Sequence, residues 1–106
     1  MNDQVKSLPD FDSKYTMPCM YTGFIQVDNT TDSNLFYWFY RDENLNEKAP
    51  FALWLNGGPG ISSQLGNFVE TGPLRLVKDQ NGKIKVHSLE NQAWTAVTNV
   101  VYVDQP

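Results

Sequence analysis

The sequence predicts an α/β fold, in which an antiparallel hairpin leads into parallel strands of one incomplete sheet. Three short apolar runs, at 35–40, 51–55 and 100–103, support this prediction, because uninterrupted apolar runs of this length are typical of strands buried on both faces. A glycine-rich turn and a helical pattern separate the second run from the third. A strand, a helix and a strand in this order favour parallel pairing of 51–55 with 100–103.

The expected elements begin with an irregular arm at residues 1–20, which are polar with scattered aromatic side chains. Residues 21–106 are expected to form the domain itself. Within it, 21–27 are rich in aromatic and β-branched residues and predict a strand. The turn-forming residues at 28–34 then join this strand to the run 35–40 as an antiparallel hairpin.

A helix is expected to follow the glycine-rich turn, with Ser62 or Ser63 as its N-terminal cap. Its predicted apolar face comprises Leu65, Phe68 and Val69. Further on, the turn signal Gln80-Asn81-Gly82 predicts a second hairpin between 74–77 and 84–87.

Length and composition exclude several classes of function. The chain has 106 residues and a net charge of −4, without the basic cluster that nucleic-acid binding requires. No stretch reaches the length of a transmembrane helix, so no membrane partner is expected. Cys19 is the only cysteine, which excludes an intrachain disulfide and a cysteine metal site, and no cofactor is predicted. Because the chain stops just after the apolar run 100–103, we expect it to be a fragment.

The segment Asn56-Gly57-Gly58-Pro59-Gly60 carries the clearest chemical signal. A strand that ends in a glycine-rich turn and then opens a helix can direct backbone N–H groups at a negatively charged atom. Consecutive glycines let the chain approach a ligand closely, and a proline stiffens the turn. The segment therefore predicts a binding loop for an anion or a developing negative charge.

Further motifs flank this loop in a characteristic order. They are Tyr21-Thr-Gly-Phe24, Leu35-Phe-Tyr-Trp-Phe39, Leu53-Trp-Leu-Asn56, Ile61-Ser-Ser63, Glu70-Thr-Gly-Pro73, Trp94 and Asn99-Val-Val-Tyr-Val-Asp-Gln-Pro106. Together they resemble the N-terminal part of the serine carboxypeptidases, from about Tyr21 to the end of the chain. The resemblance implies the α/β-hydrolase fold and a serine-type hydrolase that releases C-terminal residues from peptides or proteins.

The resemblance also assigns roles to four residues. The backbone N–H of Gly58 is implied to be an oxyanion-hole donor, which stabilises the negative oxygen of the tetrahedral stage. Asn56, the N–H of Gly57 and Glu70 are implied to bind the free carboxylate of the substrate. A glutamate that faces a carboxylate must carry a proton to donate a hydrogen bond, so such a site is expected to work best in acid.

The catalytic triad is not expected within this chain. Ser62 and Ser63 follow a glycine as in a G-x-S-x-G elbow, but Gln64 breaks that pattern. In the family the nucleophile, the aspartate and the histidine come later, which places them beyond Pro106. His87, the only histidine, is assigned a surface or packing role. The isolated chain is therefore predicted to be inactive.

Alternatives remain open at this stage. The chain is either a fragment of a serine carboxypeptidase or a non-catalytic remnant or binding module, and a family acyltransferase is also possible. The resemblance implies a secretory, lysosomal or vacuolar protein, although the sequence opens without the apolar segment of a signal peptide. Ile61 stands where the family usually has a disulfide-forming cysteine, which weakens that inference. Asn29 begins an Asn-Thr-Thr acceptor pattern for N-glycosylation in a polar loop.

Overall fold

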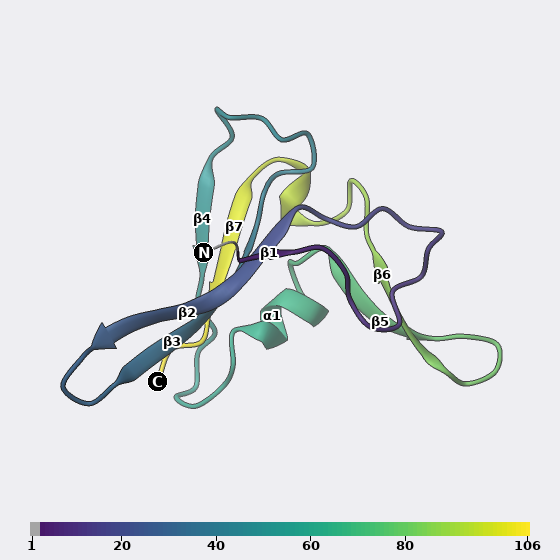
Figure 1. Cartoon of the computed structure of the whole chain (residues 1–106). Coiled ribbons are helices and arrows are strands. Elements are labelled where there is room, and N and C mark those ends of the chain that lie inside the picture. Colours follow the sequence, from purple (N-terminus) through teal and green to yellow (C-terminus); the bar gives the residue numbers. More distant parts are fainter. Residues whose placement is uncertain (1–2) are drawn as a thin grey trace.

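The structure, a computed structural model, describes residues 3–106 and contains two sheets with a short helix between them (Figure 1). The larger sheet has the strand order β1 (Gln4–Val5), β2 (Met20–Asp28), β3 (Ser33–Tyr40), β7 (Asn99–Val103) and β4 (Phe51–Trp54). The smaller sheet pairs β5 (Leu74–Lys78) with β6 (Ile84–Ser88). Helix α1 (Gln64–Val69) follows β4, and the 3₁₀ turn η1 (Trp94–Ala96) precedes β7.

The pairing of the strands confirms the predicted topology. β2 and β3 form an antiparallel hairpin, and β3 pairs antiparallel with β7. β7 and β4 are parallel, with Ala52 opposite Val100. The long excursion through α1 and the β5–β6 hairpin makes this parallel pairing possible, because parallel neighbours need a crossover connection.

The core lies on one face of the larger sheet, beneath α1 and the β5–β6 hairpin (Figure 1). Its fully buried apolar side chains are Met20, Tyr40, Leu74, Val100 and Tyr102. The Tyr40 hydroxyl donates a 2.8 Å hydrogen bond to Oδ1 of Asn67, and its ring meets that of Tyr102 edge-on at 5.9 Å. Burial raises the pKa of both Tyr40 and Tyr102, so both phenols stay neutral in the folded chain.

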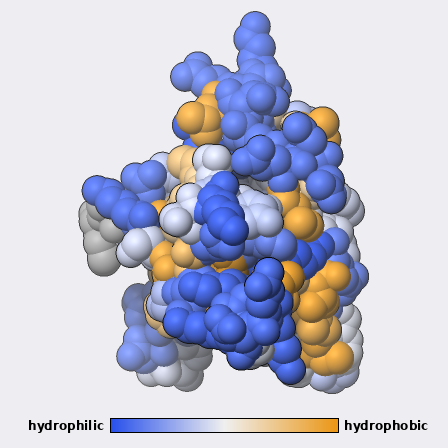
Figure 2. Space-filling model, turned by 90° about the vertical axis from the view of Figure 1, so that its right-hand side faces the viewer, coloured by the Kyte–Doolittle hydropathy of each residue, from blue (hydrophilic) through white to orange (hydrophobic). Residues whose placement is uncertain are grey.

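The opposite face of the larger sheet is uncovered, so the prediction that its strands are buried on both faces is wrong for this structure. Phe51 and Leu53 are 64% and 57% exposed, whereas Ala52 and Trp54 between and after them are half-buried. This alternation arises because successive side chains of a strand point to opposite faces, and only one face carries a covering layer. The side of the molecule in Figure 2 is mostly hydrophilic, with hydrophobic side chains along its right-hand edge.

Helix α1 lies where it was predicted, but of its predicted apolar face only Phe68 packs against the core. Leu65 and Val69 are 48% and 60% exposed, and the helix buries Gly66 and Asn67 instead. Asn67 is satisfied in the core because its amide accepts from Tyr40 and donates to Oε1 of Gln64 at 3.0 Å. Gly66 is buried because the indole of Trp54 occupies the space that a Cβ would need.

The described part of the N-terminal arm is mostly irregular up to β2, which begins at Met20, and it contacts both sheets. Residues 1–2 of the expected arm lie outside the described residues. Its first part contributes the two-residue strand β1, and a later part runs beside β6 (Figure 1). There the N–H of Asp12 donates to the carbonyl of Val86 at 2.8 Å, and the N–H of Val86 donates to Asp10 at 2.9 Å. The predicted β5–β6 hairpin is confirmed, and its turn contains Gly82 with φ of 78°.

Candidate functional site

The glycine-rich loop leaves the C-terminal end of β4 and leads into α1. Gly58 and Gly60 have φ of 115° and 86°, a region that side chains disfavour. A Cβ on Gly58 would also lie 2.9 Å from Cγ1 of Ile61. Glycine is therefore required at position 58 both by its dihedral angle and by its close approach to a neighbour.

Two adjacent backbone donors in this loop have no partner. Within residues 3–106 the N–H groups of Gly57 and Gly58 donate no hydrogen bond, and both residues are exposed. No heavy atom beyond the immediate chain neighbours lies within 4 Å of where a Gly57 Cβ would stand. Both N–H groups are therefore free to donate to an acceptor from outside the described chain.

The side-chain amide of Asn56 has one fixed end and one free end. Its Oδ1 accepts hydrogen bonds from Nε1 of Trp54 at 2.6 Å and from the N–H of Gly66 at 3.3 Å. Indole and backbone N–H groups only donate, so the oxygen and not the nitrogen must face them. Nδ2 has no hydrogen-bond partner in the described part of the chain, and it is left as a third donor beside the two glycines.

The main chain of Asn56 is held by Ser63 and Gln105. The N–H of Asn56 donates to Oγ of Ser63 at 3.1 Å, and the same hydroxyl donates to Oε1 of Gln105 at 2.8 Å. Nε2 of Gln105 donates in turn to the carbonyl oxygen of Asn56. Sequence reasoning did not identify Gln105, although it is the second residue after β7 and ligand sites form where parallel strands end.

A second set of hydrogen bonds ties the start of α1 to Asp104. Its Oδ1 accepts from Oγ of Ser62 at 2.7 Å and from the N–H of Ser63 at 2.8 Å. Oγ of Ser62 also accepts from the N–H of Gln64 at 3.1 Å, whereas Ser63, the N-cap residue of α1, makes no side-chain capping bond. Because Ser63 is fully buried and both hydroxyls are engaged in this way, their geometry suits structural roles and not that of a nucleophile.

Glu70 lies just after α1 and is exposed. Its main chain is anchored, because its N–H donates to Gly66 at 3.1 Å and its carbonyl accepts from Nη2 of Arg75 at 2.9 Å. Its carboxylate makes no hydrogen bond or ion pair with any described residue. The structure therefore brings Asn56, Gly57 and Gly58 together in one loop, and no direct bond joins Glu70 to them.

Comparison with known proteins decides the family. The family model described as serine carboxypeptidase matches residues 9–106. The chain belongs to the serine carboxypeptidase family. Over 86 residues it is 45% identical to carboxypeptidase Y homolog A of Phaeosphaeria nodorum, covering 81% of this chain and 15% of that protein. It is 38% identical over 103 residues to serine carboxypeptidase-like 15 of Arabidopsis thaliana, covering 96% of this chain and 23% of that protein.

A solved structure gives the same result for the fold. The prohormone-processing carboxypeptidase Kex1Δp of Saccharomyces cerevisiae superimposes with a TM-score of 0.64 at 35% identity, covering 84% of this chain and 19% of that chain. The predicted fold class is therefore confirmed, as the mixed α/β arrangement of part of a carboxypeptidase. This serine carboxypeptidase chain spans between 15% and 23% of the length of these relatives.

Three other residues singled out in the sequence lie away from the loop. His87 is on β6, where its ring meets that of Tyr15 at 4.5 Å, which fits the packing role assigned to it. Cys19 is half-buried with Sγ 4.0 Å from the Tyr21 hydroxyl. Asn29 is exposed in the β2–β3 turn. Among residues 3–106 no group of side chains could hold a metal ion, and no helix is long and apolar enough to cross a bilayer.

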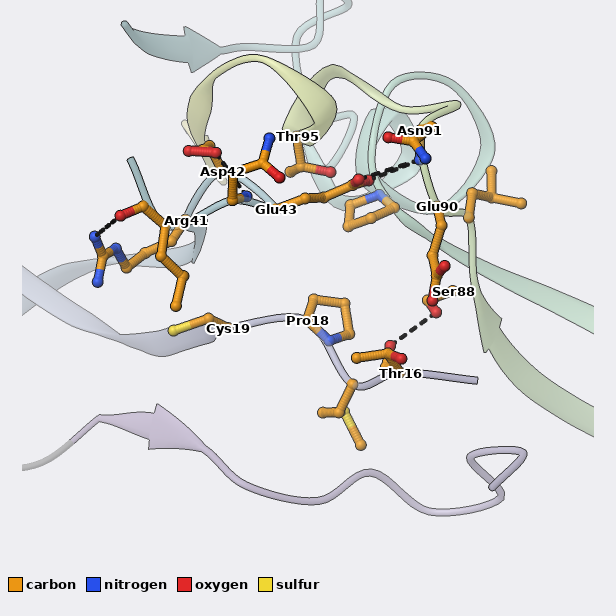
Figure 3. Close-up of a pocket in the computed structure, with 15 residues that line it drawn as sticks. Thr16, Pro18, Cys19, Arg41, Asp42, Glu43, Ser88, Glu90, Asn91 and Thr95 are labelled. Carbon is orange, nitrogen blue, oxygen red and sulfur yellow. Dashed lines mark hydrogen bonds between the residues drawn. The ribbon is translucent and has the colours of Figure 1, made fainter. Parts of the chain in front are cut away.

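A recess of about 390 Å³ lies between the N-terminal arm, the loop after β3 and the turn after β6 (Figure 3). Two of its acidic side chains, those of Asp42 and Glu43, hold the local loops. Both carboxylate oxygens of Asp42 accept backbone N–H bonds, at 2.8 Å each, and the Glu43 carboxylate accepts from the N–H of Asn91 at 3.1 Å. Neither the glycine-rich loop nor Glu70 lines this recess.

Proposed function

We propose that this chain supplies the substrate-binding loop of a serine-type carboxypeptidase. The N–H of Gly58 acts as an oxyanion-hole donor, and Nδ2 of Asn56 with the N–H of Gly57 binds the terminal carboxylate of a peptide or protein. The observation that carries the proposal is the set of three donors, on consecutive residues of one constrained loop, that have no partner among the described residues. The nucleophile and its base come from other parts of the complete enzyme.

The spacing of these donors suits an enzyme that removes one residue at a time. In such a substrate the terminal carboxylate and the scissile carbonyl belong to neighbouring residues, so their two binding groups must also be close. Asn56 and Gly58 are two positions apart in a loop whose glycine dihedrals bend it sharply. A missing oxyanion donor raises the barrier by about 2.7–4 kcal/mol in serine hydrolases, so exact placement of Gly58 is essential.

We include Glu70 in the carboxylate site as a donor that acts when protonated. It stands one helical turn beyond Gly66, whose N–H contacts Asn56, and its carboxylate has no competing partner among the described residues. A glutamine at this position donates a hydrogen bond without a proton. Glu70→Gln is therefore expected to move the loss of activity at rising pH to higher pH, measured as kcat/KM against pH on free-acid peptides.

The expected partners are C-terminal segments of peptides or proteins, with no nucleic acid, membrane or cofactor. We also propose that the complete enzyme works in the secretory, lysosomal or vacuolar route. The description of the yeast relative as a prohormone-processing carboxypeptidase supports both parts of this proposal.

The decisive experiment compares free-acid and C-terminally amidated peptides in the full-length enzyme that contains these residues. Asn56→Ala is expected to lower kcat/KM on free-acid peptides by about 10- to 150-fold, which corresponds to about 1.5–3 kcal/mol for a hydrogen bond to a charged group. Amidated peptides lack the charge and are expected to lose far less. Asn81→Ala, in the exposed β5–β6 turn, is the matched control. Equal losses on both substrates would show that the loop is only a structural turn.

A further inference from the structure

We propose that Gln105 is a positioning residue of the carboxylate site, whose side-chain amide sets the direction in which the Gly57 N–H points. The proposal rests on the function proposed above and adds a residue that does not itself touch the substrate. It follows from the way three hydrogen bonds close around the main chain of a single residue, Asn56.

The hydrogen bonds of Gln105 form a closed ring with Asn56 and Ser63. Nε2 of Gln105 donates to the carbonyl oxygen of Asn56, and Oε1 accepts from the Ser63 hydroxyl at 2.8 Å. That hydroxyl accepts the N–H of Asn56 at 3.1 Å, which completes the ring. Ser63 is fully buried and Gln105 is half-buried, so water competes little for these bonds.

This ring fixes the peptide unit between Asn56 and Gly57. In residues 3–106 the only cis peptide bond is Gly58–Pro59, so the Asn56–Gly57 peptide is trans. The carbonyl and the N–H of a trans peptide point in opposite directions within one plane. Holding the Asn56 carbonyl toward Gln105 therefore directs the Gly57 N–H away from the end of β7, to the exposed side of the loop.

Nothing else in the described chain holds that peptide unit in place. Gly57 has no side chain, no atom packs where its Cβ would be, and its N–H has no internal partner. Glycine also allows a wide range of dihedral angles, so this unit is free to rotate once its carbonyl is released. The amide of Gln105 is therefore the restraint that preorganises this donor before a substrate arrives.

The chemistry of the ring requires a glutamine at position 105. The side chain must donate to the Asn56 carbonyl and accept from the Ser63 hydroxyl at the same time, and an amide does both. A leucine provides neither contact. An ionised glutamate accepts from Ser63 but turns a second oxygen toward the carbonyl of Asn56. A protonated glutamate regains the donor, so it should restore the ring in acid.

The test uses the full-length enzyme that contains these residues and the ratio of kcat/KM on free-acid to amidated peptides. Gln105→Leu is expected to lower this ratio about tenfold, through a higher KM for free-acid peptides. A tenfold change is the size of effect expected when one hydrogen bond to a charged group is lost. Gln105→Glu is expected to show the same loss at neutral pH and to recover part of it in acid. Gln92→Leu, at an exposed glutamine without a hydrogen bond in the described chain, is the control.

The outcomes separate this proposal from the function on which it rests. If Asn56→Ala lowers the ratio and Gln105→Leu leaves it unchanged, the positioning role is overturned and the carboxylate site stands. If Gln105→Leu reduces activity on both substrates equally, the residue only supports the fold and the proposal is again overturned. If neither variant lowers the ratio, the carboxylate site itself is wrong. If Gln105→Leu fails to fold, the test uses Gln105→Glu, and a free-acid to amide ratio that does not recover in acid overturns the proposal.

Discussion

The indole Nε1 of Trp54 donates a 2.6 Å hydrogen bond to Oδ1 of Asn56, two residues further along the chain. The indole is itself held edge-on against the ring of Trp94, with 5.4 Å between the ring centroids. The Trp54 side chain, which packs against the core, therefore also orients the polar end of the proposed carboxylate site. Because the contact fixes which end of the amide faces outward, it bears directly on substrate choice.

Trp54→Phe is expected to keep most of the ring packing and to remove this donor. The Asn56 amide then retains only the N–H of Gly66 and gains freedom to rotate. We expect the preference of the full-length enzyme for free-acid over amidated peptides to fall by about 3- to 10-fold, within the range for one hydrogen bond. Trp94→Phe, which changes the neighbouring ring and leaves the hydrogen bond, is the control. An unchanged preference in Trp54→Phe would show that the indole donor does not orient the amide.

Gly66→Ala tests the close approach between α1 and β4. A Cβ at this position would overlap the indole of Trp54 and lie 2.8 Å from Oδ1 of Asn56. We expect a loss of about 1–3 kcal/mol in unfolding free energy, the usual cost of inserting a methyl group into a packed site. Thermal or denaturant unfolding of the full-length enzyme measures it, with exposed Leu65→Ala as the control. Unaltered stability would mean that the two elements separate readily.

Tyr40→Phe is expected to have a pH-dependent effect on stability. At neutral pH it leaves Oδ1 of buried Asn67 without its donor, at a cost of about 1–3 kcal/mol. Burial raises the pKa of Tyr40 above its unfolded value of about 10. The contribution of the neutral Tyr40 phenol to the unfolding free energy is therefore fully present below pH 10, and it declines as the pH rises above that value.

The phenylalanine variant lacks this ionisation, so its deficit relative to the natural chain should shrink above pH 10. The expected change is at most about 1.4 kcal/mol per pH unit, the value for one titrating group. Denaturant unfolding of the full-length enzyme with and without Tyr40→Phe, between pH 7 and 11, measures the difference. A deficit that stays constant over this range would contradict a raised pKa for Tyr40.

The isolated 106-residue chain is expected to associate or to lack fixed tertiary packing. One face of its larger sheet is uncovered, and Phe51 and Leu53 stand exposed on the edge strand β4. Exposed apolar edge strands promote association. Near-UV circular dichroism with thermal unfolding, combined with light scattering, measures this behaviour, and Leu53→Lys should reduce association. A sharp unfolding transition from a monomer would show that these residues suffice for a stable fold.

The strands and their pairing could be predicted from the sequence, because the apolar runs mark the strands and the turn residues mark where the strands end. Sequence reasoning misjudged the buried face of α1, where Asn67 is buried through its bonds to Tyr40 and Gln64, which no helical periodicity reveals. Through the motif it proposed Asn56, Gly57 and Gly58 as site residues, and the structure places all three in one loop. It did not find Gln105, because that residue's role depends on the parallel pairing of β4 with β7, which brings distant segments together.

The hydrogen bonds that shape the glycine-rich loop reach forward along the chain. Ser63 bonds to Asp104 and Gln105 across 41 and 42 positions, and Gln105 bonds to Asn56 across 49. Since a polypeptide emerges from the ribosome N-terminus first, the loop is exposed while these partners are still unmade. During that interval the glycine-rich loop is already synthesised, but its hydrogen bonds to Asp104 and Gln105 have not yet formed. Its binding geometry is therefore acquired only after β7 has been synthesised and joins the sheet, which brings Asp104 and Gln105 into contact with the loop.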